Sequence, residues 1–114
     1  MNYIIHTPSA MRLKKEILER VSENVDANGK GIATWLVAET DGSEKVLVHT
    51  TVQWAEKGCI ALTQQPESNE ILVRFHYWDS CEDQSVDDDM IMLGRFTELL
   101  LVHFSYYVDK IAIE

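Results

Sequence analysis

The residues that could perform chemistry gather in the last third of the chain, where a histidine, a cysteine and several carboxylates follow one another. His76 and Cys81 are five residues apart, with Asp79 between them and Asp83 just beyond. A cysteine–histidine pair acts as a nucleophile only when the thiolate, the imidazole and an orienting carboxylate lie within hydrogen-bonding reach. The negative charge around Cys81 opposes thiolate formation, and no catalytic motif surrounds either residue. We therefore predict no catalytic residues.

An acidic stretch over residues 79–89 is the strongest charge feature of the sequence. Its carboxylates are candidates for contact with a partner: Asp79, Glu82, Asp83, Asp87, Asp88 and Asp89. Ca²⁺ requires six to eight oxygen ligands, and an EF-hand register starting at Asp79 has Cys81, Gln84 and Met90 at key positions. We therefore predict no metal and no cofactor. The stretch is interpreted as a docking surface for basic groups, with a solvated loop or a loose, weak cation site as the alternatives.

Aromatic residues near the acidic stretch complete the candidate partner-binding site. Tyr77 and Trp78 end the apolar segment that precedes it, and Tyr106 belongs to an apolar segment that follows it. Aromatic side chains are enriched at protein interfaces. We therefore include Tyr77, Trp78 and Tyr106 in the candidate site, with plain core packing as the alternative.

The overall charge limits the class of partner. The 114 residues include 10 Lys and Arg against 19 Asp and Glu, a formal net charge of −9. Nucleic acids and anionic membrane surfaces are bound largely through Lys and Arg, so we predict neither as a partner. A basic protein, or a second copy of the chain, fits this composition better.

The sequence also predicts where the protein resides. No apolar segment reaches the roughly 20 residues that cross a bilayer. The N-terminal residues lack the basic and apolar regions of a secretion signal. We therefore expect a cytoplasmic protein in which Cys59 and Cys81 are free thiols.

Periodic spacing of apolar residues predicts the helix and strands that position these groups. Apolar residues recur three or four apart from Ala10 to Val21, which is typical of one face of a helix. We expect this helix to begin at Pro8 and to end near Asn28, because Asn-Gly at 28–29 favours the left-handed conformation that ends helices.

Alternating apolar and polar residues predict the strands of a sheet. We expect strands over residues 3–7, 31–40, 45–53, 59–64, 70–78 and 110–114. Asp41-Gly42 is a hairpin signal, since both residues can take positive φ. A second turn, which contains proline, is expected over residues 65–69.

A second helix is expected after the acidic stretch. It should begin near Ser85, because Ser85 and Asp88 have the spacing of a capping box, and it should extend to about Tyr107. Gly94 costs about 1 kcal/mol relative to alanine inside a helix, so a kink at Gly94 and a start at Arg95 are the alternatives. The second half is apolar nearly all round, which is typical of a helix buried on several sides or used in an interface.

The element order β-α-β-β-β-β-α-β predicts an α+β fold with a single domain over residues 1–114. Two helices on one face of a mainly antiparallel sheet of about six strands would form a two-layer sandwich. This order resembles the ferredoxin-like β-α-β-β-α-β sandwich with an extra hairpin between its halves, a resemblance of architecture that implies no function. The strand order within the sheet stays open.

These observations favour a binding protein over an enzyme. We expect a small protein-binding or regulatory module that uses its acidic loop and the neighbouring aromatic residues to bind a basic partner. Two alternatives stay open. One is a small metal-dependent hydrolase that combines the acidic loop with His76, and the other is a homodimeric structural protein.

Overall fold

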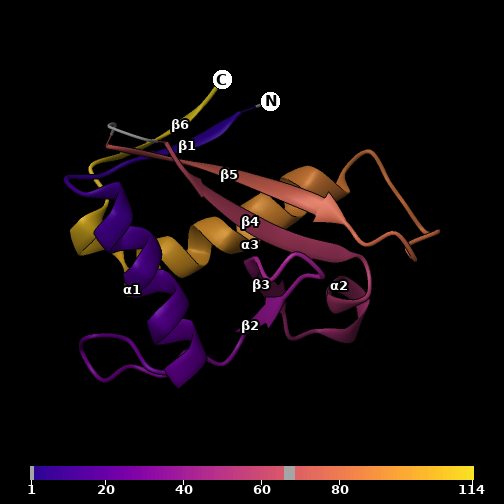
Figure 1. Ribbon diagram of the computed structural model, residues 1–114, viewed down its shortest axis with the longest axis horizontal. Helices are drawn as coiled ribbons and strands as arrows, with labels where there is room; N and C mark the ends of the chain where they lie inside the picture. Colours follow the sequence, from indigo (N-terminus) through magenta and orange to yellow (C-terminus); the bar gives the residue numbers. More distant parts are fainter. Residues whose placement is uncertain (1, 66–68) are drawn as a thin grey trace.

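Both long helices of the protein lie on the same face of one antiparallel sheet (Figure 1), in a computed structural model that describes residues 2–65 and 69–114. The strands are β1 (Tyr3–His6), β2 (Trp35–Glu39), β3 (Lys45–His49), β4 (Gly58–Gln64), β5 (Glu70–Tyr77) and β6 (Lys110–Ile113). The helices are α1 (Ala10–Glu23), the short α2 (Val52–Ala55), α3 (Asp88–His103) and the 3₁₀ turn η1 (Ser105–Tyr107). The predicted two-layer α+β sandwich is confirmed.

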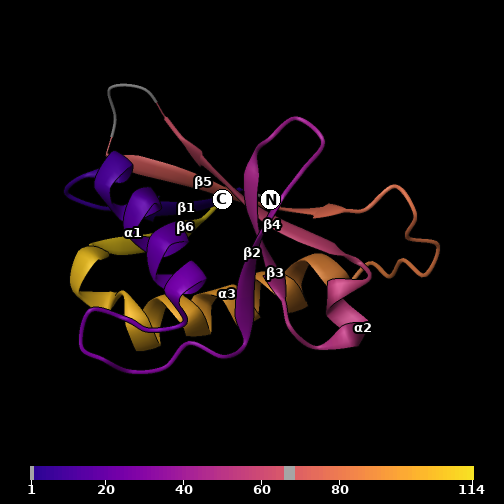
Figure 2. The same cartoon turned by 60° about the horizontal axis from the view of Figure 1, so that its bottom comes forward.

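The strands follow the order β2-β3-β4-β5-β1-β6, and each neighbouring pair is antiparallel. Strands β4-β5-β1-β6, together with α1 and α3, have the ferredoxin-like arrangement that the sequence resembles. The extra hairpin, β2–β3, extends the sheet beside β4, which it meets near the centre of Figure 2. Strand β6 pairs with β1, so the C-terminus is held in the sheet and lies next to the N-terminus (Figure 1).

The hydrophobic core fills the space between the helices and the sheet, and α3 lies at its centre. The Phe96 ring meets Tyr3 of β1 and Trp35 of β2 edge-on, with ring centroids 6.1 and 6.2 Å apart. The hydroxyl of Tyr3 also lies 2.6 Å from Oγ1 of Thr97, which satisfies its polar atom inside the core. Because β1 and β2 are far apart in the sheet order, α3 covers most of the width of the sheet.

Helix α1 is amphipathic as predicted, but it ends one turn earlier than expected. Its N-cap is Ser9, whose side chain accepts a hydrogen bond from the backbone of Arg12. The helix stops at Asn24, which adopts the left-handed conformation with φ of 63°. The predicted stop near Asn28 is therefore wrong, because an asparagine one turn earlier already takes the conformation that ends a helix. Gly29 has positive φ as well, but it lies in the loop that follows.

The loop after α1 is fixed to the far end of α3 by a buried polar pair. His103 Nδ1 lies 2.7 Å from Oδ2 of Asp26, whose side chain is almost completely buried. The same carboxylate accepts backbone hydrogen bonds from Asn28 and Lys30, at 2.9 and 2.8 Å. These contacts, first of all the hydrogen bond from His103, lower the pKa of Asp26 below its usual value, although burial opposes them.

The hairpin between β2 and β3 is confirmed, with differences at its turn and at its end. The two strands pair from Trp35 opposite His49 to Glu39 opposite Lys45. Positive φ falls on Ser43, not on Asp41 and Gly42 as expected. Beyond His49 the chain forms α2 instead of continuing the strand, so the predicted end at residue 53 is wrong. The second predicted turn includes residues 66–68, which lie outside the described residues.

Helix α3 is continuous from Asp88 to His103. It begins three residues after the predicted start at Ser85, and the alternative start at Arg95 is wrong. Gly94 does not break the helix, because buried apolar residues on both sides of it pack into the core and outweigh a cost of about 1 kcal/mol. The predicted final turn is the separate η1, which begins at Ser105.

The second face of the sheet is partly buried as well. A small cluster on it contains Val46, Val48, Cys59 and Ala61, and the half-buried Trp78 packs against them. Burial raises the pKa of the Cys59 thiol to about 11, with the nearby Glu44 adding to the effect. At neutral pH this cysteine is therefore a protonated packing residue.

Gly58 is the first residue of β4, and it lies at a place where no side chain fits. A Cβ at this position would overlap the carbonyl oxygen of His76 on β5 and lie 2.9 Å from the ring of Phe75. By contrast, a Cβ at Gly42 in the hairpin turn would meet nothing within 4 Å.

The first prediction follows from this close approach. Gly58→Ala should lower the free energy of unfolding by about 1–3 kcal/mol, because the new methyl group must push β4 and β5 apart. Gly42→Ala is the matched control and should change it little. Urea unfolding followed by circular dichroism measures both variants, and equal stability of the two would contradict the prediction.

The second prediction concerns the stability of the fold at acidic pH. A carboxyl group with a lowered pKa in the folded state stabilises the fold above its ordinary pKa, 3.8 for Asp26, and this contribution is lost as pH falls further. Asp26→Asn should therefore destabilise the protein at pH 7 and reduce the loss of stability between pH 7 and about pH 3. Urea unfolding at both pH values tests this, with Asp41→Asn in the exposed turn as control. An unchanged pH dependence in Asp26→Asn would refute the assignment.

Candidate functional site

The N-terminal end of α3 is organised around one buried carboxylate. Asp88 is only 2% exposed. It accepts hydrogen bonds from Nζ of Lys57 at 3.0 and 3.1 Å and from the backbone N–H of Ser85 at 2.8 Å. The hydroxyl of Tyr77 lies 2.8 Å from the same group. The bond to Ser85 is the one that the predicted capping-box spacing requires of Asp88.

Lys57 reaches this carboxylate from the residue just before β4. Its ammonium also donates to the backbone carbonyl of Asp83 at 2.7 Å, and it lies 5.6 Å from the centre of the Trp54 ring. An ammonium group has three protons to donate, and two oxygens of Asp88 and one of Asp83 receive them. Lys57 is therefore a structural residue that fixes the loop after β5 to the sheet.

The charges of this cluster stabilise one another. The hydrogen bond to Asp88 is the main reason that the pKa of Lys57 is raised. Burial alone would raise the pKa of Asp88, but hydrogen bonds from Ser85, Tyr77 and Lys57 outweigh it and lower the pKa. The pKa of Tyr77 is raised, first by burial and then by its bond to Asp88. At neutral pH the pair is therefore a carboxylate and an ammonium, which neutralise each other.

Residues 79–87, here called the acidic loop, extend beyond the rest of the molecule at this end (Figures 1 and 2). Four of its carboxylate side chains are exposed: Asp79, Glu82, Asp83 and Asp87. Within residues 2–65 and 69–114, Asp79, Glu82 and Asp87 make no ion pair, and the almost fully exposed Asp83 is 3.9 Å from Nζ of Lys57. The loop thus combines an anchored backbone with carboxylates that are free to meet another molecule.

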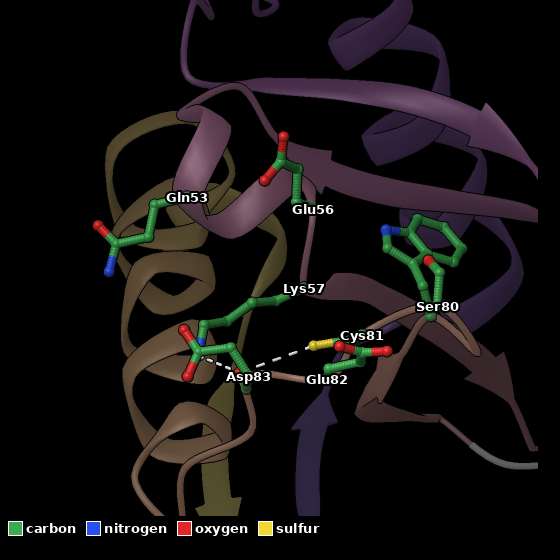
Figure 3. A pocket seen from close by; sticks show the side chains of 8 residues that line it. Gln53, Glu56, Lys57, Ser80, Cys81, Glu82 and Asp83 are labelled. Carbon is green, nitrogen blue, oxygen red and sulfur yellow. Dashed lines mark hydrogen bonds and ion pairs between the residues drawn. The ribbon is translucent and has the colours of Figure 1, made fainter.

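An open hollow of about 590 Å³ lies between α2 and the acidic loop (Figure 3). Its lining residues are Gln53, Glu56, Lys57, Trp78, Ser80, Cys81, Glu82 and Asp83. In Figure 3, Lys57 lies between Glu56 on one side and Glu82 and Asp83 on the other. Because the charge of Lys57 is balanced by Asp88, the three remaining carboxylates make the hollow negative.

The structure places the predicted site residues in different environments. The prediction that Asp88 contacts a partner is wrong, because Asp88 is buried and paired with Lys57. Asp89 is half-buried on the first turn of α3. Tyr77 is half-buried with its hydroxyl engaged, and the Trp78 indole N–H donates to the carbonyl of Ala55 at 2.8 Å.

The predicted place of Tyr106 beside the acidic stretch is also wrong. Tyr106 is 94% exposed, but it lies in η1, beyond the far end of α3 from the acidic loop (Figure 1). A helix of this length, 16 residues, separates its two ends by about 24 Å. Tyr106 therefore does not belong to the same surface as the acidic loop.

His76 and Cys81, the candidate nucleophilic pair, are not joined by a hydrogen bond in the described part of the chain. His76 pairs with Cys59 on the second face of the sheet. The thiol of Cys81 lies 3.7 Å from the backbone carbonyl oxygen of Asp83. Among the described residues, no three His, Cys, Asp or Glu side chains converge in a way that could hold a metal ion.

Sequence reasoning missed the residues that hold the site together. Lys57 is 31 positions from Asp88, and His103 is 77 positions from Asp26. No local pattern links either pair. Glu56 was missed because it follows α2, which the alternation of apolar residues did not predict. The one signal that was present, the capping-box spacing, pointed to a local role for Asp88 and not to its burial.

The chain shows no significant match to any protein-family model, curated protein or solved structure. None of the helices within residues 2–65 and 69–114 is long and apolar enough to cross a membrane. The site must therefore be interpreted from its own geometry and charge.

The third prediction tests the buried pair. Asp88→Asn should lower the melting temperature by roughly 10 °C or more, because it leaves the Lys57 ammonium buried without a counter-charge. Asp87→Asn removes the same charge from an exposed neighbour and should have little effect. Lys57→Met combined with Asp88→Asn should be less destabilising than the sum of the single changes. Thermal unfolding measures these three variants and Lys57→Met alone, and additive effects would contradict the pairing.

Proposed function

We propose that this protein is a cytoplasmic protein-binding module whose acidic loop recognises a basic group on a partner protein. One observation carries the proposal: the backbone of the loop is fixed by Lys57 and Tyr77, while Asp79, Glu82 and Asp87 have no partner of their own among the described residues. A structural ion-pair network would instead satisfy such carboxylates within the chain.

The anchored loop favours binding for a thermodynamic reason. A flexible loop loses conformational entropy when it binds, and a loop already held in place loses less. Exposed charges of one sign also attract an oppositely charged partner over a distance, which raises the association rate. The acidic loop supplies both properties, because its backbone is held at Asp83 and Ser85 and its carboxylates are exposed to water.

Trp78 and the hollow suggest the kind of group that is bound. The indole N–H of Trp78 already donates to Ala55, so the aromatic ring, not a hydrogen bond, is what Trp78 offers a ligand. Glu56, Glu82 and Asp83 line the same hollow. Carboxylates around an aromatic ring suit the side chain of arginine or lysine, through ion pairs and a cation–π contact.

The metal-dependent hydrolase has no comparable support. His76 lies on the second face of the sheet, beside Cys59, whereas Tyr77 and Asp88 lie on the helix-covered face. No observation in the described part of the chain favours it over binding.

The fourth prediction tests the proposed function with an arginine-rich peptide as a probe. Glu82→Gln combined with Asp83→Asn should slow association by roughly tenfold at low ionic strength and flatten its salt dependence. The matched control is Glu19→Gln with Glu23→Gln on α1, which removes the same charge from another surface and should slow association less. Stopped-flow fluorescence of Trp78 and the other tryptophans would follow binding.

The same three proteins serve as baits in a native lysate, washed with increasing salt and analysed by mass spectrometry. A basic protein retained by the unmodified chain and by the α1 control, but lost with the loop variant, would support the proposal. If the two double variants bind the probe and the lysate proteins equally, the acidic loop is not the binding site.

A further inference from the structure

Helix α3 exposes an apolar face that the fold leaves uncovered. Most of the large hydrophobic side chains exposed in the described part of the chain lie on or beside this helix: Val86, Met90, Ile91, Leu101, Val102 and Tyr106. Met90 and Leu101 are 58% and 59% exposed, although the opposite side of α3 forms the centre of the core. Isolated exposed apolar residues are common, but a continuous group of them marks an interaction site.

Four of these residues form two rows along the helix. Met90 and Leu101 are eleven residues apart, and so are Ile91 and Val102. Eleven residues make about three helical turns, so each pair lies on one edge of the exposed face. Gly94 lies between the two rows, where a Cβ would meet nothing within 4 Å.

The two rows are arranged symmetrically about the level of residue 96, so an antiparallel copy of the same helix would match them. We infer that α3 packs against α3 of a second copy of this chain in an antiparallel, two-fold symmetric dimer. In a two-fold pairing each contact occurs twice. Met90 of each chain then faces Leu101 of the other, and Ile91 faces Val102, so that both rows are covered by their own counterparts.

The charges on the same face fit this arrangement. Arg95 and Glu98, 3.5 Å apart within one helix, lie midway along α3. An antiparallel copy brings a second Arg95 next to the first Glu98 and a second Glu98 next to the first Arg95. The four groups then form a closed set of opposite charges at the symmetry axis.

The acidic loops oppose the parallel alternative. The first turn of α3 carries Asp88 and Asp89, and the acidic loop precedes it. A parallel pair would place two such loops side by side, and repulsion between them would oppose association. In the antiparallel pair the loops lie at opposite ends of the dimer, each next to the uncharged η1 of the other chain.

The size of the face indicates a weak dimer. Helix α3 is about 24 Å long, and one helix face buries less than the ~800 Å² per partner of a standard interface. Gly94 compensates in part for the small contact area, because the absence of a side chain at the centre lets the two helices approach closely. The dimer does not depend on the proposed function, since its contacts are made by α3 and not by the acidic loop.

Sedimentation equilibrium over about 1 to 500 µM protein tests the inference in a range suited to a weak dimer. The unmodified chain should change from monomer to dimer within this range. Leu101→Glu should raise the dissociation constant by about tenfold or more, because it places a charge in the apolar contact of both copies. Met11→Glu, on the similarly exposed α1 position, should have no effect. A chain that stays monomeric at every concentration would overturn the inference.

The central charges provide a test of the geometry. Arg95→Glu should weaken the dimer, because four carboxylates then meet at the axis. The double variant Arg95→Glu, Glu98→Arg restores alternating charge and should restore association. Circular dichroism verifies that each variant is folded. If the double variant dimerises no better than Arg95→Glu, the antiparallel register is wrong.

A cysteine pair separates the two directions, in a background with Cys81→Ser. Met90→Cys mixed with Leu101→Cys should give a disulfide-linked heterodimer under mild oxidation, since antiparallel helices bring these positions together. Each variant alone should cross-link poorly. Strong homodimer cross-linking by Met90→Cys alone would show a parallel pair and overturn the proposal.

Discussion

The buried ion pair between Lys57 and Asp88 is the contact on which the rest of the acidic end depends. It joins the residue before β4 to the first residue of α3, and so connects the sheet to the helix layer. Burying two charges is costly unless their geometry and hydrogen bonds are complete, and here Tyr77, Ser85 and the carbonyl of Asp83 complete them. The same side chains hold the backbone of the acidic loop at Asp83 and Ser85, so its remaining carboxylates are presented on an anchored backbone.

Helix α3 separates two surfaces of different character. The acidic loop lies before its first turn and is strongly negative, whereas its exposed side is apolar with one opposite-charge pair, Arg95 and Glu98. The buried side of the same helix contacts β1 and β2 through Phe96. One helix therefore fixes the position of the loop, holds the core together and offers a surface to a second copy. A single orientation of α3 in the fold decides all three.

Where prediction and structure differ, a contact distant in sequence or a competing local residue explains the difference. Asn24 ended α1 before the stronger Asn-Gly signal was reached, because asparagine can take the same left-handed conformation. Strand β3 ends at His49 and is followed by α2, although apolar and polar residues continue to alternate in the sequence. Asp88 is the clearest case: the capping-box spacing with Ser85 was correct, but its carboxylate was counted with the exposed acidic residues.

The sequence by itself determined the two long helices, the six strands, the two-layer α+β class and the negative charge of the surface, because periodicity, composition and capping act over a few residues. It also located the apolar α3, although not which side would be exposed. The tertiary structure alone decided the strand order, the pairing of Lys57 with Asp88 and of Asp26 with His103, and the separation of Tyr106 from the acidic loop. Those features depend on which distant segments pack together, and burial then turns a charged residue from a surface group into an internal contact.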